Sequence, residues 1–286
     1  MNRRNFLSTC AAAAAASAFP YHLYAAEKAK LATDRVKLGP KQVELSRLAM
    51  GTGSTGWNKS SNQTRKLGIK GLADLLVAGV DNGVTFWDTA DQYGSHPHLA
   101  EGLKTVKREK VTIMTKTRAK TADEMKADLD RFRKELNTDY IDILLLHCLT
   151  DKEWNTKMRG VMDVISEAQE KGIIKTKGCS CHSLDALKTA AAEPWVEVDL
   201  ARLNPKQAAM DADPATVIGV LKEMKAKGKG VIGMKVYGDG KLAEQRDQML
   251  QYILAQDVID CFTIGMESHD HLTDNIKRIK ESSVRA

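Results

Sequence analysis

The sequence lacks the features that mark several common classes of protein. After its N-terminal segment, no run approaches the roughly 20 apolar residues of a membrane-spanning helix, so we expect no membrane anchor. No linker, internal repeat or low-complexity stretch divides it, and its length suits either one barrel domain or two smaller domains. Cysteine is scarce, with 5 in 286 residues, and the spacing matches neither a zinc ribbon nor a disulfide framework.

The sequence alone does not decide between disulfide pairing and a packing role for the cysteines. Those after the N-terminal segment are Cys148, Cys179, Cys181 and Cys261. They could pair in an oxidising compartment, but we expect small core residues or residues that line a site. Cys179 and Cys181 lie two residues apart on one expected strand, so they share a face and cannot easily bond to each other.

The charge of the chain points to no nucleic-acid partner. The net charge is +6, and part of it comes from Arg3 and Arg4 at the N-terminus. Elsewhere Lys and Arg alternate with Asp and Glu, as in residues 122–135, which is typical of the solvated face of a helix.

Residues 1–26 read as a signal peptide. They have a basic start, an alanine-rich stretch and then small residues, with candidate cleavage points after Ala18, Ala25 and Ala26. The string RRNFL resembles the twin-arginine export motif, so we expect the twin-arginine machinery as a partner and a periplasmic location. A general secretory signal is the alternative. Residues 27–286 would then form the mature domain.

The rest of the chain alternates between strand and helix patterns. Strands are expected near 46–51, 84–88, 111–116, 141–147, 175–180, 196–203, 231–236 and 261–265. Helices are expected near 64–82, 99–107, 122–136, 157–171, 183–192, 214–227, 241–255 and 270–280. Eight strands alternating with eight helices predict an α/β fold of the (β/α)8 TIM-barrel type. Residues 35–45, with Gly39-Pro40 in the middle, predict a hairpin that closes the bottom of the barrel.

Polar residues at the expected strand ends are candidates for catalysis, because such barrels place their chemistry there. Asp88 ends the second strand and Tyr93 follows it, while Lys116 and His147 end the next two strands. An ammonium favours a nearby phenolate, so Lys116 should lower the pKa of Tyr93 from about 10. Asp88 would hold Lys116, and His147 could orient or polarise a carbonyl oxygen. Each residue alone is more often structural, but the four together are far more specific.

Two stretches resemble the aldo-keto reductase family. GVTFWDTADQYG is similar to the family signature, and TADEMKADLDRFRKELNTDYIDILLLH resembles its third helix and fourth strand. The resemblance runs from about residue 36 to 280. It implies that Tyr93 is the general acid in reduction or the base in oxidation, tuned by Lys116 and Asp88. It also implies that His147 directs the substrate carbonyl, that hydride moves between nicotinamide C4 and the carbonyl carbon, and that no metal takes part.

The resemblance gives a weaker match to the residues that contact the cofactor. Gly51 and Thr52 fit the turn near the nicotinamide ribose, and Ser180 matches the serine that holds the carboxamide. A cysteine follows Ser180 where the family usually has asparagine, and the glutamine of strand six is not evident. Met234 or Lys235 takes the place of the aromatic residue that stacks on the nicotinamide.

The segment IGMESHDHLTDN aligns without gaps to the family's adenosine-phosphate segment, where Gly265, Asp274 and Asn275 match. Glu267 stands where a basic residue often binds the 2′-phosphate of NADP. A carboxylate repels a phosphate and can accept a hydrogen bond from a ribose hydroxyl. The cofactor is therefore expected to be NAD or NADP, with NAD favoured unless a neighbour such as Lys277 compensates.

Several alternatives remain open. His96 and His98 could bind a substrate or a metal, or merely line the loop after Tyr93, and Trp57 could line the pocket or its rim. His147, Cys148, Cys179, Cys181 and His182 could look like a metal cluster, but several fall at catalytic or cofactor positions.

No motif in the sequence identifies the substrate. The chain ends soon after its last expected helix, so we expect an open, shallow site for a polar small molecule such as a sugar. We also expect the protein to be a monomer. The alternative functions are a barrel that only binds a ligand, and redox-neutral sugar chemistry on a cofactor that the protein retains.

Overall fold

The computed structural model describes residues 29–284, so the predicted signal peptide (1–26) lies outside the described residues. Parallel strands close into a barrel in the order β10-β3-β4-β5-β6-β7-β8-β9, which confirms the predicted TIM barrel. The strands are β3 Leu48–Gly51, β4 Phe86–Asp88, β5 Thr112–Thr117, β6 Ile141–Leu149, β7 Ile174–Cys181, β8 Val198–Arg202, β9 Gly230–Met234 and β10 Cys261–Gly265.

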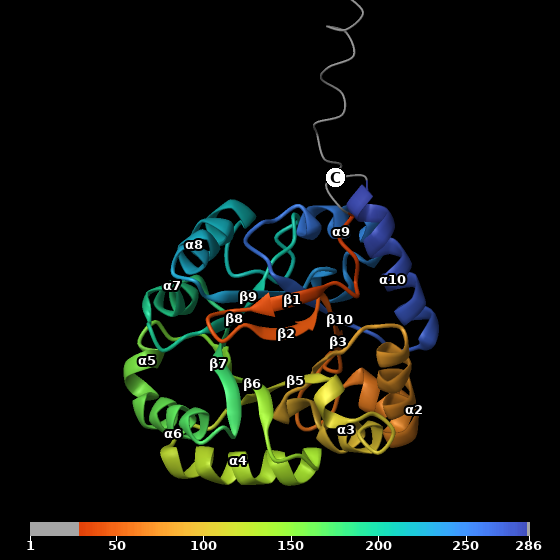
Figure 1. The fold of residues 1–286 in the computed structure, drawn as a ribbon. Coiled ribbons are helices and arrows are strands. Elements are labelled where there is room, and N and C mark those ends of the chain that lie inside the picture. The colour runs from red at the N-terminus through yellow and green to blue at the C-terminus, as the bar shows by residue number, and fades with distance from the viewer. Residues whose placement is uncertain (1–28, 285–286) are drawn as a thin grey trace, which may run out of the picture.

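Helices surround the barrel (Figure 1). They are α2 Asn62–Asp81, α3 His96–Gly102, α4 Ala122–Leu136, α5 Trp154–Lys157, α6 Arg159–Glu170, α7 Leu184–Ala192, α8 Pro214–Ala226, α9 Arg246–Leu254 and α10 His269–Val284. Short 3-10 turns are η1 Asp91–Tyr93, η2 Arg108–Lys110, η3 Gly238–Gly240 and η4 Ala243–Gln245. The helix expected over 157–171 is divided at Met158, and the one expected over 241–255 begins with the 3-10 turn η4 before α9.

Local sequence explains where the helices begin. Ser61 and Thr64 form a capping box that starts α2, and Thr121 and Glu124 form another that starts α4. Each box pairs side-chain oxygens with backbone N–H groups that the first turn leaves without partners. Inside α2 the backbone departs from helical geometry at Gly68, where φ is 61°.

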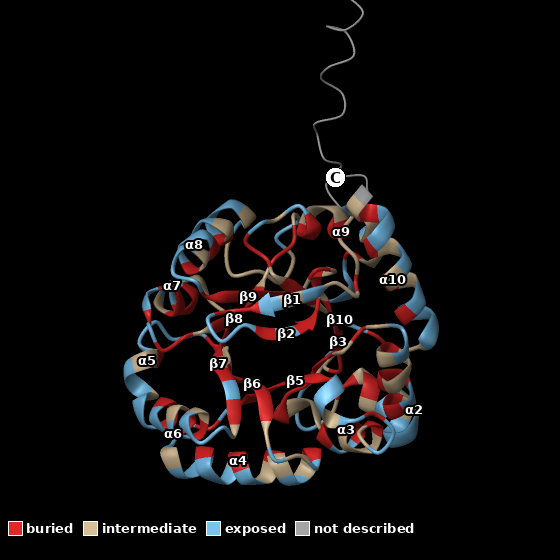
Figure 2. Cartoon of the chain, in the orientation of Figure 1, coloured by how far each residue is buried: buried red, intermediate tan, exposed pale blue. Residues whose placement is uncertain are grey.

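Most residues of the barrel strands are buried, as Figure 2 shows by their red colour against helices that are exposed on their outer faces. Successive residues of a strand point to opposite sides of the barrel wall. On β8, Val198 and Leu200 belong to the cluster that fills the barrel interior, together with Phe86 and Ile143. The residue between them, Asp199, therefore faces outward toward the helix layer.

The predicted hairpin is confirmed. Strands β1 (Arg35–Leu38) and β2 (Val43–Ser46) pair in an antiparallel manner and lie across one end of the barrel (Figure 1). Leu38 and Leu45 are fully buried and belong to the interior cluster. At the turn, Gly39 has a φ of 61°, and a Cβ there would lie 3.0 Å from the carbonyl oxygen of Glu197, so this position requires glycine.

Across the described ranges, no helix is long and apolar enough to cross a membrane. Cys148, Cys179, Cys181 and Cys261 are all free, and all but Cys148 are buried, as expected for core residues.

Candidate active site

The structure brings Asp88 and Lys116 into a buried ion pair at the carboxyl ends of β4 and β5. Lys116 Nζ donates to Asp88 Oδ1 and, at 2.8 Å, to the carbonyl oxygen of Thr89. The second carboxylate oxygen of Asp88 accepts a hydrogen bond of 2.7 Å from Thr263 Oγ1. Lys116 is fully buried, so its charge depends on these partners.

Tyr93 lies over this ion pair. Lys116 Nζ is 4.9 Å from the centroid of its ring. The ring meets that of His147 edge-on, with centroids 5.6 Å apart. The other side of the phenol packs on the backbone of the β3–α2 loop, since a Cβ on Gly53 would lie 2.2 Å from Tyr93 Cε2 and one on Gly56 would lie 2.4 Å from Cδ1. The four residues predicted for catalysis thus converge.

The expected effect of Lys116 on Tyr93 is wrong in its sign. Burial, followed by the negative charge of Asp88, raises the pKa of Tyr93 well above its ordinary value. The physical reason is that Asp88 offsets the ammonium of Lys116, while burial disfavours a phenolate. Tyr93 is therefore a protonated phenol at neutral pH.

His147 has a neutral imidazole at neutral pH. Burial first, and then the charge of Lys116, place its pKa well below the ordinary value of histidine. Its Nδ1 is buried and has no hydrogen-bond partner within residues 29–284. A neutral ring in this position can exchange a hydrogen bond with a substrate oxygen without repelling a cation.

Cys148 and His182 line the cavity beside His147, with Cys148 Sγ 3.6 Å from His182 Nε2. Burial raises the pKa of the Cys148 thiol and lowers the pKa of His182 to about 4. Proton transfer between them is therefore unfavourable, and the pair stays neutral. The backbone of Cys148 is left-handed, with φ at 60°, as is that of Lys235, at 58°. Such conformations are uncommon outside glycine and concentrate at functional sites.

These residues share a cavity of about 700 Å³ at the carboxyl ends of the strands. Most of the residues predicted to contact the cofactor also line it: Gly51, Met234, Lys235, Gly265, Glu267 and Asn275. The sequence did not single out other residues of its wall, including Tyr237, Asn62 and Arg246. Asn62 begins α2, directly after the β3–α2 loop that forms part of the wall, but no local motif marks it.

Thr52, Ser180 and Asp274 were also predicted to contact the cofactor, but they do not line this cavity. Thr52 is buried, and its Oγ1 donates a hydrogen bond of 2.9 Å to the carbonyl oxygen of Asp88. Ser180 is buried and accepts a hydrogen bond of 3.3 Å from the backbone N–H of Cys148. Asp274 is held by Arg246 at 3.1 Å and by Arg278 at 2.8 Å. Their cofactor roles stay predictions.

Glu267 is a paired carboxylate. Asn62 Nδ2 donates to its Oε1 at 2.8 Å, and Lys66 binds its Oε2. Burial opposes ionisation, but the hydrogen bonds from Lys66 and Asn62 outweigh it, so the pKa of Glu267 lies below its ordinary value. The carboxylate is therefore charged at neutral pH, with part of its field offset by Lys66.

The histidines left open by the sequence do not line this cavity. His96 is buried between Thr115, 2.7 Å from its Nε2, and Glu135, 2.7 Å from its Nδ1. His98 is also buried. Trp57, in contrast, lines the cavity while 55% of its surface is exposed, and Arg118 stacks on its ring at 4.8 Å.

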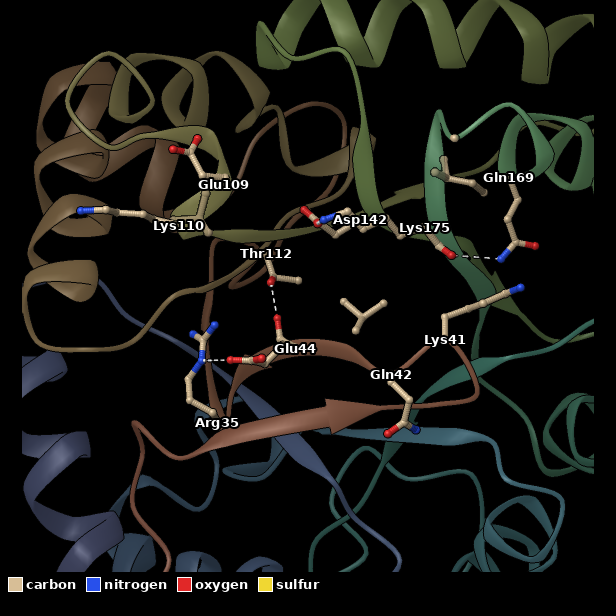
Figure 3. A pocket seen from close by; sticks show the side chains of 14 residues that line it. Arg35, Lys41, Gln42, Glu44, Glu109, Lys110, Thr112, Asp142, Gln169 and Lys175 are labelled. Carbon is tan, nitrogen blue, oxygen red and sulfur yellow. Dashed lines mark hydrogen bonds and ion pairs between the residues drawn. The ribbon is translucent and has the colours of Figure 1, made fainter.

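A second cavity, of about 660 Å³, lies between the hairpin and the amino-terminal ends of the strands (Figure 3). Its charged side chains largely neutralise one another, as in the pairs Arg35–Glu44 at 2.8 Å and Lys175–Asp142 at 2.7 Å. It contains none of the residues at the carboxyl ends of the strands, where barrels of this kind hold their chemistry. We therefore place the candidate active site in the first cavity.

Comparison with known proteins gives the family. The model of the aldo/keto reductase family matches residues 47–283, so the chain belongs to the aldo/keto reductase family. "Probable aldo-keto reductase 1" of Glycine max is 28% identical over 172 residues, which are 55% of this chain and 47% of that protein. D-threo-aldose 1-dehydrogenase of a Pseudomonas species is 22% identical over 214 residues, 62% of this chain and 64% of that protein. The matches thus span less than two thirds of these relatives.

Solved structures agree on the fold. The holo form of an aldo-keto reductase from Bacillus halodurans has a TM-score of 0.69 and 18% identity, covering 88% of this chain and 95% of that one. A Pseudomonas aeruginosa protein described as an aldo-keto reductase has a TM-score of 0.72 and 20% identity. The match covers 89% of this chain and 97% of that one. At these identities the likeness shows the fold alone.

Proposed function

We propose that this chain is a nicotinamide-dependent oxidoreductase that interconverts a carbonyl and an alcohol on a polar substrate of the sugar type. The observation that carries the proposal is the convergence of Asp88, Lys116, Tyr93 and His147 on one cavity. Each contributes a group that carbonyl reduction needs: a proton donor, a buried cation beside it and a neutral hydrogen-bonding ring.

Tyr93 is the proposed proton donor for reduction. Its raised pKa keeps the phenol protonated, and Lys116 lies 4.9 Å from the ring centroid, where it stabilises the negative charge that forms as the proton leaves. His147 would bind the substrate oxygen and hold it near this proton. In oxidation the same groups act in the reverse direction.

The chemistry of the cavity wall fits a nicotinamide dinucleotide. Buried Met234 and Val236 offer apolar surface, and Arg246 and Lys235 offer cations suited to phosphates. The residues that would hold the cofactor are Gly51, Met234, Lys235, Gly265, Glu267 and Asn275. When bound, the nicotinamide supplies or accepts the hydride.

We propose NAD as the preferred cofactor, because Glu267 is a charged carboxylate on the cavity wall. A 2′-phosphate near it would be repelled, whereas a ribose hydroxyl could donate a hydrogen bond to it. Lys66 binds the same carboxylate and limits this preference.

A polar, sugar-type substrate is supported by two observations. Trp57 presents an exposed indole at the cavity, and such rings pack against the apolar faces of sugars. The relative that is 22% identical is named D-threo-aldose 1-dehydrogenase. A panel in which only apolar aldehydes were turned over would refute this part of the proposal.

The first test of the proposal is release of bound small molecules by denaturation, with identification by mass spectrometry, followed by titration of NAD and NADP. Turnover of aldoses and ketoses should then fall by about 10²–10⁴ in Tyr93→Phe, the usual contribution of acid–base catalysis. The matched control is Tyr140→Phe, because Tyr140 does not line the cavity. Its ring instead packs against Arg108, whose Cζ lies 4.0 Å from the ring centroid. Absence of nicotinamide binding, with ligand affinity unaltered in Tyr93→Phe, would favour a barrel that only binds its ligand.

We further propose, from the sequence alone, that the twin-arginine machinery exports the chain with its cofactor bound. Replacing Arg3 and Arg4 by lysine should retain the protein in the cytoplasm. Unchanged export of that variant would point to the general secretory route instead.

A further inference from the structure

A cluster of two thiols and a carboxyl group lies in the wall of the barrel. Cys179 Sγ is 3.8 Å from Cys181 Sγ and 3.3 Å from Asp199 Oδ1. All three residues are buried, and one ligating atom from each lies within 4.8 Å of the others. Asp199 comes from β8 and is paired in register with Cys179 on β7.

The cluster is separate from the candidate active site. Cys179 and Cys181 belong to the apolar layer between the barrel and the helices, and neither they nor Asp199 line the active-site cavity. Ser180 lies between the two cysteines and points to the other side of the strand, where it binds the backbone of Cys148. The helices next to the cluster are α7 and α8, which flank β7, β8 and β9 (Figure 1).

The carboxylate of Asp199 is incompletely satisfied. Its Oδ2 is buried and has no hydrogen-bond partner in the part of the chain that the structure describes. Buried polar atoms without a partner are rare in folded proteins, because leaving one unpaired costs about 1–3 kcal/mol. The unpaired Oδ2 of Asp199, near the sulfur atoms of Cys179 and Cys181, is therefore available to bind a metal ion.

The spacing of the sulfur atoms suits zinc. Zn–S bonds of about 2.3 Å in tetrahedral geometry place two sulfur ligands roughly 3.8 Å apart. The distance between the Cys179 and Cys181 sulfur atoms is 3.8 Å. Asp199 can supply both oxygens, Oδ1 beside Cys179 and the unpartnered Oδ2, which would complete four coordinating atoms.

The local charge balance also favours a divalent cation. Lys229 is buried, and its Nζ donates to the carbonyl oxygens of Ala190 at 2.7 Å and Glu193 at 2.6 Å. Its positive charge acts on Cys179 and Asp199. Asp211 also acts on Asp199, but it is paired with Arg202 and adds no net charge. Two thiolates, one carboxylate, one Zn²⁺ and one ammonium sum to zero, so the occupied site would bury no net charge.

We propose that Cys179, Cys181 and Asp199 bind one Zn²⁺ ion in a structural site that ties β7 to β8, with Lys229 as the balancing charge. Binding displaces the two thiol protons to solvent, together with any proton held by the buried Asp199 carboxyl group, since all three ligands must be ionised. The family resemblance implied no metal in catalysis, and this site lies outside the catalytic cavity. The proposal of a zinc site is therefore independent of the proposed function.

The second group of metal-ligating residues, Asp91, His96 and Glu135, does not make an equivalent site. Its carboxylates already form ion pairs with basic side chains. Lys59 and Arg131 bind Asp91, and Arg131 also binds Glu135 at 3.0 Å. A metal ion would have to displace these side chains.

The test measures zinc in the purified full-length protein by elemental analysis after dialysis against zinc-free buffer. We expect close to one ion per chain in the wild type, and a loss of most of it in Cys181→Ala and Asp199→Asn. Cys261→Ala is the matched control, because Cys261 is also a buried, free cysteine on a barrel strand, yet it lies in the interior cluster. It should retain the ion.

A second measurement uses the wild type alone and does not depend on whether the variants fold. Replacing zinc by cobalt(II) should produce a thiolate-to-metal charge-transfer band in the near ultraviolet, and a strong chelator should lower the melting temperature. A wild type without zinc and without a cobalt band would overturn the proposal. So would equal zinc in Cys181→Ala, and bound copper in place of zinc would overturn the identity of the metal.

Discussion

Tyr93 is a residue on which burial and charge act together. Burial and Asp88 both raise its pKa above the ordinary value, so the acid form persists to higher pH than in a free tyrosine. Because reduction uses the protonated phenol, we expect the reduction rate to stay level through neutral pH and to fall only above about pH 10.

The measurement is a pH profile of kcat for reduction under saturating cofactor. In Asp88→Asn, the fall should move to lower pH, since Lys116 then acts on the phenol without an opposing carboxylate. A fall near pH 7 in the wild type would show that another group, not Tyr93, limits the proton transfer.

Glu267 is the residue on which the choice of cofactor should depend. Glu267→Gln removes a negative charge from the cavity wall, and we expect the ratio of NADP to NAD affinity to rise about tenfold, on the order of 1.4 kcal/mol. Lys66→Gln should act in the opposite direction, because it frees the carboxylate from its cation.

Both cofactor affinities are measured by titration, with Glu281→Gln as the control, since Glu281 is exposed on α10. An unchanged ratio in both cavity variants would mean that Glu267 does not face the ribose.

At the scale of the element, the β3–α2 loop determines where Tyr93 lies. In Gly53→Ala, the new Cβ would lie 2.2 Å from Tyr93 Cε2, so the ring must shift. A displacement near 1 Å can reduce catalysis by about 10². We expect kcat to fall by about that factor while the fold is retained.

Gly219→Ala in α8 is the matched control, because no atom lies within 4 Å of its Cβ position. It should leave kcat unchanged and stabilise the helix by about 0.5–1 kcal/mol. Normal activity in Gly53→Ala would mean that the β3–α2 loop shifts to accommodate the new Cβ and leaves the ring of Tyr93 in place.

The elements themselves were largely predictable from the sequence, whereas contacts between them were not. Periodicity indicated the eight strands, and the strand-end rule indicated Asp88, Lys116 and His147. The sign of the pKa shift of Tyr93 was missed because it depends on burial, which a motif does not encode. The position of Asp199 beside Cys179 follows from the register of β7 and β8, and a linear pattern cannot give that register.

At the scale of the whole molecule, a network of ion pairs and hydrogen bonds joins several elements around the site. Glu135 of α4 binds His96 of α3 at 2.7 Å and Arg131 at 3.0 Å, and Arg131 also holds Asp91 of η1 at 2.6 Å. The hydrogen bond from His96, with help from Arg131 and against the effect of burial, lowers the pKa of Glu135 from 4.5 to about 2.

A carboxyl group whose pKa is lower in the folded state stabilises that state above its unfolded pKa, and the effect is lost as pH falls through the folded pKa. Glu135→Gln should therefore lower the melting temperature at pH 7, and the difference from the wild type should shrink between about pH 4.5 and pH 2. Thermal unfolding at pH 7, 5 and 3 measures this. The control is Glu223→Gln, because Glu223 is exposed on α8.

The pH dependence separates charge from packing in this network. If Glu135 acts through its charge, the loss of melting temperature in Glu135→Gln must be smaller at pH 3 than at pH 7, because the unfolded wild type is protonated at pH 3 and part of the stabilisation is lost. If the loss of melting temperature in Glu135→Gln were the same at pH 7 and pH 3, its cause would be poorer packing of the glutamine and not the lost charge. Since Arg131 also holds Asp91, two residues before Tyr93, an acid-sensitive penalty accompanied by a loss of kcat would show that the network both stabilises the barrel and positions the proton donor.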